Sequence, residues 1–283
     1  MHISQKILDK GLLSELSYLK LEHEFWKTPN SKGRLPNISS WQDIKFFLDT
    51  VPPRYTGISA DRKGVMLELL KRYTVTDFVT TPSGMQAMTI VGGGEVTVAF
   101  RGTETKDWRE LIKDGGSDGE MALGAEIDQM RDALAYFRGV EEKYGGNAAI
   151  TLTGHSLGGA LAQYVAYKSD TRYQTYTFNG FGIRKSEGII NTYKDTSHIH
   201  NFHLGVDFVS GLGSQIGGAP GGAFYETVRD VTRYIPGIKL WIKQFANLVI
   251  GLPTAARINY EIDKYMGSFL GEVISVIPYD SSD

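Results

Sequence analysis

The first feature of the chain that points to chemistry is a serine between glycines: residues 154–158 read Gly-His-Ser-Leu-Gly. A pattern of this kind mounts a nucleophilic serine on a sharp turn when a strand leads into it and a helix leads out. Because the chain holds 33 glycines, these five residues alone are a weak signal. The residues on either side determine whether the motif indicates a nucleophile. The run "AAITLT" before them is typical of a strand, and "LGGALAQYVAYKS" after the serine is typical of a helix. The context therefore predicts Ser156 as a nucleophile, against the alternative of an incidental serine in a glycine-rich turn.

The same turn predicts one half of an oxyanion hole. A helix that begins directly after Ser156 has first backbone N–H groups without an intrahelical acceptor, and its dipole adds partial positive charge there. We expect the N–H of Leu157 to point at the negative charge that develops on a substrate carbonyl oxygen. Gly154 and Gly158 suit this turn because a side chain at either position would crowd it.

A second motif lies upstream, where "VTVAFRGTETKDWRELI" ends a predicted strand and continues into Arg-Gly-Thr at residues 101–103. Together with "GHSLGG", it resembles the class 3 lipase family, α/β hydrolases that include fungal triacylglycerol lipases and bacterial lipases and phospholipases. The resemblance covers about residues 75–210. It implies that Thr103 is the second oxyanion-hole residue, beside Leu157.

The carboxylate of a serine–histidine–acid triad is expected after a later strand. "SHIHNFHLGVDFV" reads as a strand that ends in a loop, and Asp207-Phe208-Val209 resembles the family's Asp-x-Val-Pro element, with Ser210 in place of the proline. By this resemblance, Asp207 would orient the base and stabilise its charge. Asp195 is the competitor, but the "NTYKDTS" around it reads as a polar turn.

The base is the missing member of the triad. The family carries its histidine after the acid, whereas all six histidines of this chain precede Asp207: they are His2, His23, His155, His198, His200 and His203. The segment "YEIDKY" resembles the family's histidine element with Tyr260 at the histidine position, and a phenol with a pKa of about 10 is a poor base at neutral pH. Either Tyr260 replaces the histidine and the chain is inactive, or His200 or His203 serves, or the base lies elsewhere. Strand alternation points His200 and His203 to opposite faces, so at least one of them is expected in the core.

The elements that must hold these residues follow from hydrophobic periodicity. The expected helices span residues 3–26, 41–50, 61–72, 121–143 and 157–169, and the expected strands span residues 76–81, 85–91, 95–103, 148–154, 173–180 and 197–204. Their alternation predicts an α/β fold, with a mostly parallel central sheet covered by helices on both faces and extra N-terminal helices. The resemblance makes this an α/β-hydrolase fold. No shift in composition divides the chain, so one domain over 1–283 is expected, with 1–72 as an N-terminal helical extension packed on it.

Composition narrows the classes of function. The chain has 41% hydrophobic and 22% charged residues, a net charge of −2 and a pI near 6.3, so nothing favours a nucleic-acid partner. Without cysteine, disulfides and thiolate metal sites are excluded. "DGGSDGE" lacks the spacing of a calcium loop, so neither a metal nor a cofactor is expected.

Two further expectations concern location. The N-terminus carries charges every few residues, unlike a cleavable signal peptide. No run reaches the ~18 apolar residues of a membrane span. These patterns favour a cytoplasmic location or export by a leaderless route, as in bacterial effector secretion.

The residues and the resemblance together predict a carboxylic ester hydrolase of the lipase or phospholipase A1 type, which cleaves lipid esters through an acyl-serine intermediate. The resemblance implies that the segment around Trp108 is a lid that opens during transient contact with a lipid surface, although an ordinary partly buried tryptophan would also fit. It also implies a chaperone or neutralising protein as a partner. The alternative is a lipase-fold protein that is catalytically impaired by Tyr260 and acts by binding lipid or a partner.

Overall fold

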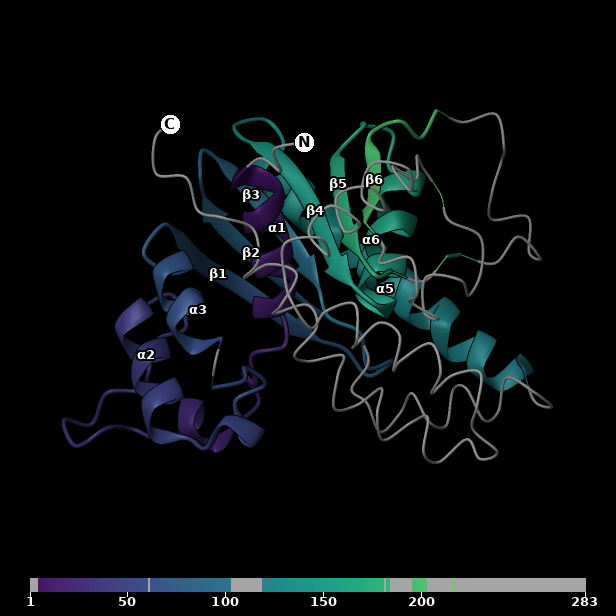
Figure 1. Cartoon of the computed structure of the whole chain (residues 1–283). Helices are drawn as coiled ribbons and strands as arrows, with labels where there is room; N and C mark the ends of the chain where they lie inside the picture. The colour runs from purple at the N-terminus through teal and green to yellow at the C-terminus, as the bar shows by residue number, and fades with distance from the viewer. Residues whose placement is uncertain are drawn as a thin grey trace, which may run out of the picture.

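The computed structural model describes residues 5–60, 62–102, 119–180, 182–183, 195–202 and 216, and for residues 119–127 it describes the backbone alone. These residues form one mixed sheet with helices on both faces (Figure 1). The helices are α1 (Gln5–Leu16), η1 (Glu24–Lys27), α2 (Trp41–Thr50), η2 (Pro53–Tyr55), α3 (Lys63–Leu69), α5 (Gly119–Tyr144) and α6 (Leu157–Lys168). The strands are β1 (Tyr73–Thr80), β2 (Gln86–Gly92), β3 (Glu95–Phe100), β4 (Ala149–His155), β5 (Gln174–Phe178) and β6 (Ile199–Phe202).

The sheet has the strand order β1-β2-β3-β4-β5-β6. The first three strands pair antiparallel, and β3, β4, β5 and β6 pair parallel. Gly93 and Gly94 form the turn between β2 and β3, and both have the positive φ that a two-residue hairpin loop requires. Helix α5 lies in the crossover from β3 to β4, and α6 lies in the crossover from β4 to β5. The predicted α/β-hydrolase fold with a mostly parallel sheet is confirmed.

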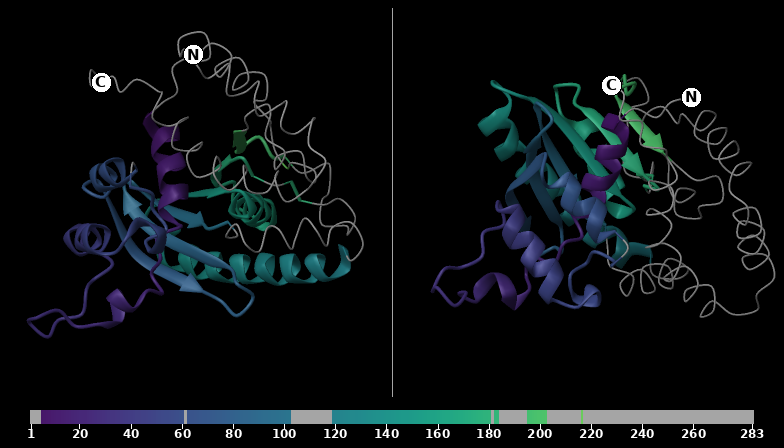
Figure 2. Two further views of the ribbon diagram at one scale, coloured as in Figure 1. Left: turned by 60° about the horizontal axis from the view of Figure 1, so that its bottom comes forward. Right: turned by 60° about the vertical axis from the view of Figure 1, so that its left-hand side comes forward.

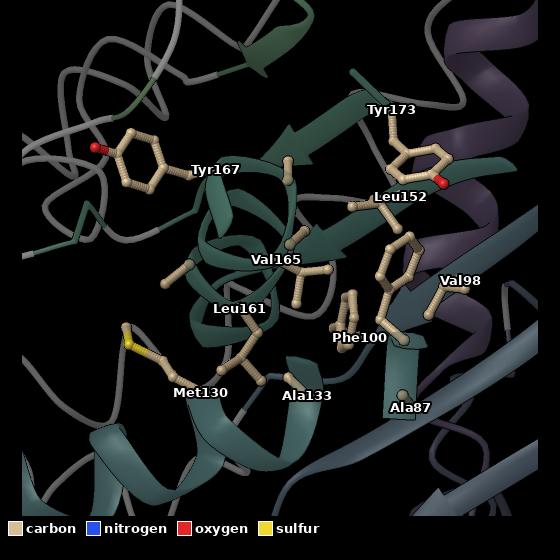
Figure 3. Packing of buried hydrophobic residues seen from close by; sticks show 14 of the residues in the cluster. Ala87, Val98, Phe100, Met130, Ala133, Leu152, Leu161, Val165, Tyr167 and Tyr173 are labelled. Atoms are coloured by element: carbon tan, nitrogen blue, oxygen red, sulfur yellow. The ribbon is translucent and has the colours of Figure 1, made fainter. Parts of the chain in front are cut away.

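Alternating side chains of the strands supply two apolar cores, one on each face of the sheet. On one face, Phe100 and Leu152 pack against Leu161 of α6 and Ala133 of α5 (Figure 3). On the other face, apolar side chains of β1, β2 and β3 pack against α1, α2 and α3. Figure 2 shows the long helix α5 running along its face of the sheet, away from the N-terminal helices. Each fully buried large apolar side chain contributes roughly 1.5–3 kcal/mol, so these faces supply much of the folding free energy.

The helix predicted over residues 3–26 is wrong in its second half, because α1 ends at Leu16. Beyond that point Leu19 and Leu21 are both buried in the N-terminal core. The backbone N–H of Leu19 donates to the carbonyl of Leu16, three residues back, so the α-helical bonding pattern has ended there. The backbone N–H of Lys20 instead donates to the carbonyl of Thr56, and only a short 3-10 helix, η1, follows.

Helix α1 meets the sheet through buried polar contacts as well as apolar ones. The fully buried Lys10 Nζ lies 2.6 Å from Glu95 Oε1 and donates to Thr97 Oγ1 at 2.5 Å. Thr153 Oγ1 of β4 donates to the Lys10 backbone carbonyl at 3.0 Å. Burial lowers the pKa of the Lys10 ammonium, while Glu95 acts in the opposite direction. Helix α1 is therefore anchored directly on β4, the strand that leads to Ser156. The prediction of a single domain over residues 1–283 stays a prediction.

Candidate active site

Ser156 occupies the turn between β4 and α6, and its backbone has the shape of a nucleophile elbow. Its φ of 61° and ψ of −130° place it in a region that L-residues rarely adopt. Among the described residues, the only other non-glycine residue with positive φ is Asn179. Such strain costs on the order of 1–3 kcal/mol and persists where the surrounding structure enforces it, often at functional sites.

Glycines on both sides make the elbow possible. A Cβ at Gly154 would lie 2.1 Å from the backbone oxygen of Gly158, and a Cβ at Gly158 would lie 2.2 Å from the backbone oxygen of Phe100. A Cβ at Gly159 would lie 2.7 Å from the Cα of Gly180. Because all three obstacles are backbone atoms, the chain at this turn packs too closely for side chains.

The segment after β3 lies directly against the serine. A Cβ built on Gly102 would be 3.1 Å from the Cβ of Ser156 and 2.8 Å from the backbone oxygen of His155. Thr103 follows Gly102 in the sequence but lies outside the described residues. Leu157, the other candidate oxyanion donor, is the first residue of α6, where a backbone N–H has no acceptor within the helix.

Strand β6 leads the chain to the same edge of the sheet. Its last residue, Phe202, is in register with Phe178, which is in register with His155 next to the serine. Asp207 follows five positions later and lies outside the described residues, so its role stays a prediction. Asp195 precedes β6, is exposed, pairs with Arg172 at 2.8 Å and accepts the backbone N–H of Ser197. These contacts support the polar-turn interpretation of Asp195.

A buried polar network holds the chain beyond the predicted acid. The backbone N–H of Ile216 donates to Gln163 Oε1 of α6 at 2.9 Å, and its carbonyl accepts from Asn201 Nδ2 of β6 at 2.9 Å. Asn201 Oδ1 in turn accepts from Thr177 Oγ1 of β5 at 2.7 Å. These three polar side chains are fully buried. Ile216, nine positions after Asp207 in the sequence, is therefore bonded to β6 and to α6, the helix that begins directly after Ser156.

None of the described histidines forms a hydrogen bond with Ser156. His155 points into the fold as predicted: it is buried, and its Nδ1 lies 2.9 Å from the Tyr18 hydroxyl. His155 Nε2 and Ser156 Oγ are both buried without a hydrogen-bond partner in the described part of the chain, so they do not bond to each other. His200 bonds to Gln174 and stacks on Tyr176 near the opposite end of the strands. His203 and Tyr260 lie outside the described residues.

Two neighbours of the elbow were missed by sequence reasoning. Asn179 follows β5, has a φ of 44°, and donates its backbone N–H to the Phe202 carbonyl. Its Asn-Gly dipeptide after a strand was an available turn signal. Tyr18 carries no such signal, because its contact with His155 joins residues 137 positions apart.

The burial of His155 predicts a pH-dependent stability. Burial lowers its pKa to about 4, below the unfolded value of about 6.5. The unfolded chain therefore binds the extra proton more readily, and the stabilisation present above pH 6.5 is lost as the pH falls toward 4. We expect a loss of roughly 3 kcal/mol from this group. Urea unfolding of the chain and of His155→Gln at pH 7 and pH 4.5 measures it. An equal loss of stability in both proteins would contradict the prediction.

The described ranges carry neither a candidate metal site nor a candidate membrane span. Those ranges contain no group of three or more histidine or acidic side chains arranged to hold a metal ion. Their helices include none with the length and apolar character of a membrane span.

Comparison with known proteins gives a family match over the catalytic motifs. The family model of the Tle-like phospholipase domain matches residues 50–239, a range that includes Thr103, Ser156 and Asp207 but neither Tyr18 nor Tyr260. A search of curated proteins found no match.

Solved structures similar to this chain include three fungal lipases. The Rhizomucor miehei lipase, in its propeptide complex, aligns at 16% identity and a TM-score of 0.44, over 79% of this chain and 67% of that chain. Lipase II from Rhizopus niveus aligns at 16% identity and a TM-score of 0.42, over 73% of each chain. Lip2 lipase from Yarrowia lipolytica aligns at 14% identity and a TM-score of 0.42, over 76% of this chain and 80% of that chain.

Proposed function

Since the chain belongs to the Tle-like phospholipase domain family, we propose that it is a carboxylic ester hydrolase that cleaves acyl esters of phospholipids through an acyl-serine intermediate. The observation that carries this proposal is the strained, buried Ser156 at the junction of β4 and α6. A serine held at positive φ on such an elbow presents its oxygen ahead of the sheet edge, where the first N–H groups of α6 are also found.

The proposed reaction proceeds in two steps. Ser156 Oγ attacks the carbonyl carbon of the ester while a general base takes the hydroxyl proton. The bond to the glycerol oxygen then breaks, the base returns the proton to that oxygen, and the lysophospholipid leaves. Water attacks the acyl-serine by the same route, which releases the fatty acid and restores the serine.

Besides Ser156, three residues are proposed for this reaction. The backbone N–H groups of Leu157 and Thr103 stabilise the oxyanion of each tetrahedral intermediate. Asp207 orients the base and stabilises its positive charge. The position of Gly102 against Ser156 supports the role of Thr103, because a residue that follows Gly102 starts beside the nucleophile. The tie between Ile216, Gln163 and Asn201 supports an acid loop in the same region.

A second candidate function rests on the absence of a histidine after Asp207 in the sequence. In this alternative, Tyr260 occupies the base position, the serine is poorly activated, and the chain acts by binding lipid or a protein partner. The described histidines support this alternative in one respect, because none of them bonds to Ser156.

The experiment that separates the two candidates is Tyr260→His, assayed beside the unaltered chain. Fatty-acid release from phosphatidylglycerol–phosphatidylethanolamine vesicles and from triacylglycerol emulsions is the measurement. Under the first candidate we expect the unaltered chain to hydrolyse vesicles faster than triacylglycerol and Tyr260→His to bring no gain, whereas under the second candidate Tyr260→His raises the rate by about a hundred- to ten-thousand-fold, the usual contribution of a general base.

Tyr265→His is the matched control, because it adds the same side chain five residues away and is expected to leave the rate unchanged. Rapid hydrolysis by the unaltered chain, without a gain in Tyr260→His, would place the base elsewhere and remove the second candidate. Preference for triacylglycerol over phospholipid would overturn the proposed substrate class.

Lipid contact, location and partners complete the proposal. We propose transient contact with a membrane surface, through the segment around Trp108, export from the cell, and a chaperone or neutralising protein as a partner. Vesicle co-sedimentation of the chain and of Trp108→Ala tests the first of these.

A further inference from the structure

Tyr18 brings the N-terminal part of the chain to the nucleophile elbow. It follows the last turn of α1, where its backbone N–H donates to the carbonyl of Glu15 at 3.0 Å. The family match begins at residue 50, so this tyrosine belongs to the part of the chain outside the matched domain. Its neighbour Ser17 already contacts the end of β3, since Ser17 Oγ lies 3.5 Å from the carbonyl oxygen of Phe100.

The phenol of Tyr18 contacts both segments that frame Ser156. Its hydroxyl lies 2.9 Å from His155 Nδ1, and the two rings meet edge to face at 5.9 Å. The same phenol oxygen lies against the backbone of Gly102, since a Cβ built on Gly102 would be 2.4 Å from it. A phenol hydroxyl can donate to or accept from a histidine ring nitrogen, so this contact is open to either tautomer of His155. One hydroxyl thus links the residue before Ser156 to the residue before Thr103.

Arg101 holds the phenol from its ring side. The guanidinium carbon of Arg101 lies 5.8 Å from the centre of the Tyr18 ring, within the range of a cation–π contact. The same guanidinium lies 3.7 Å from Glu22 and bonds to Gln86. The Tyr18 ring is therefore fixed between a buried histidine and a buried arginine, and its hydroxyl has a defined position.

The position of the hydroxyl matters because the two proposed oxyanion donors come from different strands. The N–H of Leu157 follows β4, and the N–H of Thr103 follows β3. Both donors must lie about 2.7–3.1 Å from one developing oxyanion, and a misplacement of about 1 Å can cost a hundredfold in rate. A Cβ on Gly102 would lie 2.4 Å from the Tyr18 hydroxyl and 3.1 Å from Ser156 Cβ, so the hydroxyl lies where the two strands' ends meet.

We propose that Tyr18 is a positioning residue, whose hydroxyl ties Gly102 to His155 and so holds the oxyanion segment in place relative to Ser156. This inference rests on the proposed serine mechanism. The N-terminal segment thereby contributes to the reaction without touching the substrate, and the matched domain depends on a residue from outside its own range.

The test compares Tyr18→Phe with the unaltered full-length chain in two measurements. The first is hydrogen–deuterium exchange of the peptides that cover residues 99–103 and 153–158, which needs no activity. The second is the rate of labelling of Ser156 by a fluorophosphonate, together with kcat and KM on phospholipid vesicles. We expect Tyr18→Phe to speed exchange of both peptides about tenfold, and to lower the labelling rate and kcat about tenfold at unchanged KM.

Tyr136→Phe is the matched control, because it removes a comparable phenol–side chain hydrogen bond, between the Tyr136 hydroxyl and Thr89 Oγ1 at 2.7 Å, on a part of α5 away from the elbow. It is expected to change neither measurement. Exchange and labelling that are the same in Tyr18→Phe and Tyr136→Phe would overturn the positioning role. If the unaltered chain is not labelled at all, the serine mechanism fails, and faster exchange in Tyr18→Phe alone would still establish the structural tie.

Discussion

Replacing Ser156 with alanine is expected to abolish fluorophosphonate labelling and to reduce phospholipid hydrolysis to the background rate. Alanine keeps the Cβ and the strained φ of 61°, so the backbone of the elbow is retained while the attacking oxygen is lost. In serine hydrolases with a working base, removal of the nucleophile costs on the order of 10⁶ in kcat. Intact-mass spectrometry of the labelled chain and fatty-acid release from vesicles measure the two effects.

Ser169→Ala is the matched control for this experiment. Ser169 is also a buried serine, at the other end of α6, where its hydroxyl donates to the Val165 carbonyl at 2.7 Å. Full labelling and activity are expected from it. Labelling of a residue other than Ser156, or hydrolysis by Ser156→Ala at the unaltered rate, would disprove the serine mechanism.

The size of the Ser156→Ala effect also reports on the missing base. Nucleophile and base act as a unit, so removing either costs nearly as much as removing both. A large loss in the unaltered chain means that a base is in place, and His203 and an unassigned residue are then the candidates. A loss that appears only in the Tyr260→His background means that Tyr260 has disabled the serine.

The elbow could be predicted from the sequence because its causes are local. A β-branched run, a small-x-Ser-x-small core and a helix-forming run specify strand, turn and helix within about twenty residues of each other. The steric demand at Gly154 and Gly158 follows from the same short stretch. The structure confirms the strand–turn–helix elbow and the close packing at the two glycines. The parallel half of the sheet was predictable from the alternation of strands and helices.

The surroundings of the elbow could not be predicted, because they depend on long-range packing. The periodicity predicts a helix that continues to residue 26, but α1 ends at Leu16 and the backbone N–H of Lys20 bonds to the distant carbonyl of Thr56. Lys10 reaches Thr97, and Tyr18 reaches His155, over sequence separations that carry no local pattern. Strand alternation could not decide whether His200 or His203 is the base. The contacts of His200 with Gln174 and Tyr176 are set by the register between β5 and β6, which the sequence pattern does not specify.

Replacing Gly158 with alanine is expected to destabilise the fold strongly. A Cβ there would lie 2.2 Å from the carbonyl oxygen and 2.8 Å from the carbonyl carbon of Phe100, and 2.9 Å from that of Arg101. These are backbone atoms of the end of β3, so no side-chain rotation relieves the overlap. Alanine normally stabilises a helix by about 1 kcal/mol relative to glycine, but overpacking of this kind costs about 1–3 kcal/mol or more. We expect a net loss near the upper end of that range, measured by urea unfolding.

The same substitution is expected to lower activity beyond its effect on stability. To accommodate the new methyl group, α6 and the end of β3 must move apart, and with them the two backbone segments that supply the proposed oxyanion donors. Gly139→Ala is the matched control, because Gly139 lies in the exposed part of α5 with no atom within 4 Å of its added Cβ, and alanine there should stabilise the chain. If Gly158→Ala is as stable as the unaltered chain, the close contact between α6 and β3 is not enforced. If it is unstable but labels Ser156 at the unaltered rate when folded, the spacing of these two segments does not govern the reactivity of the serine.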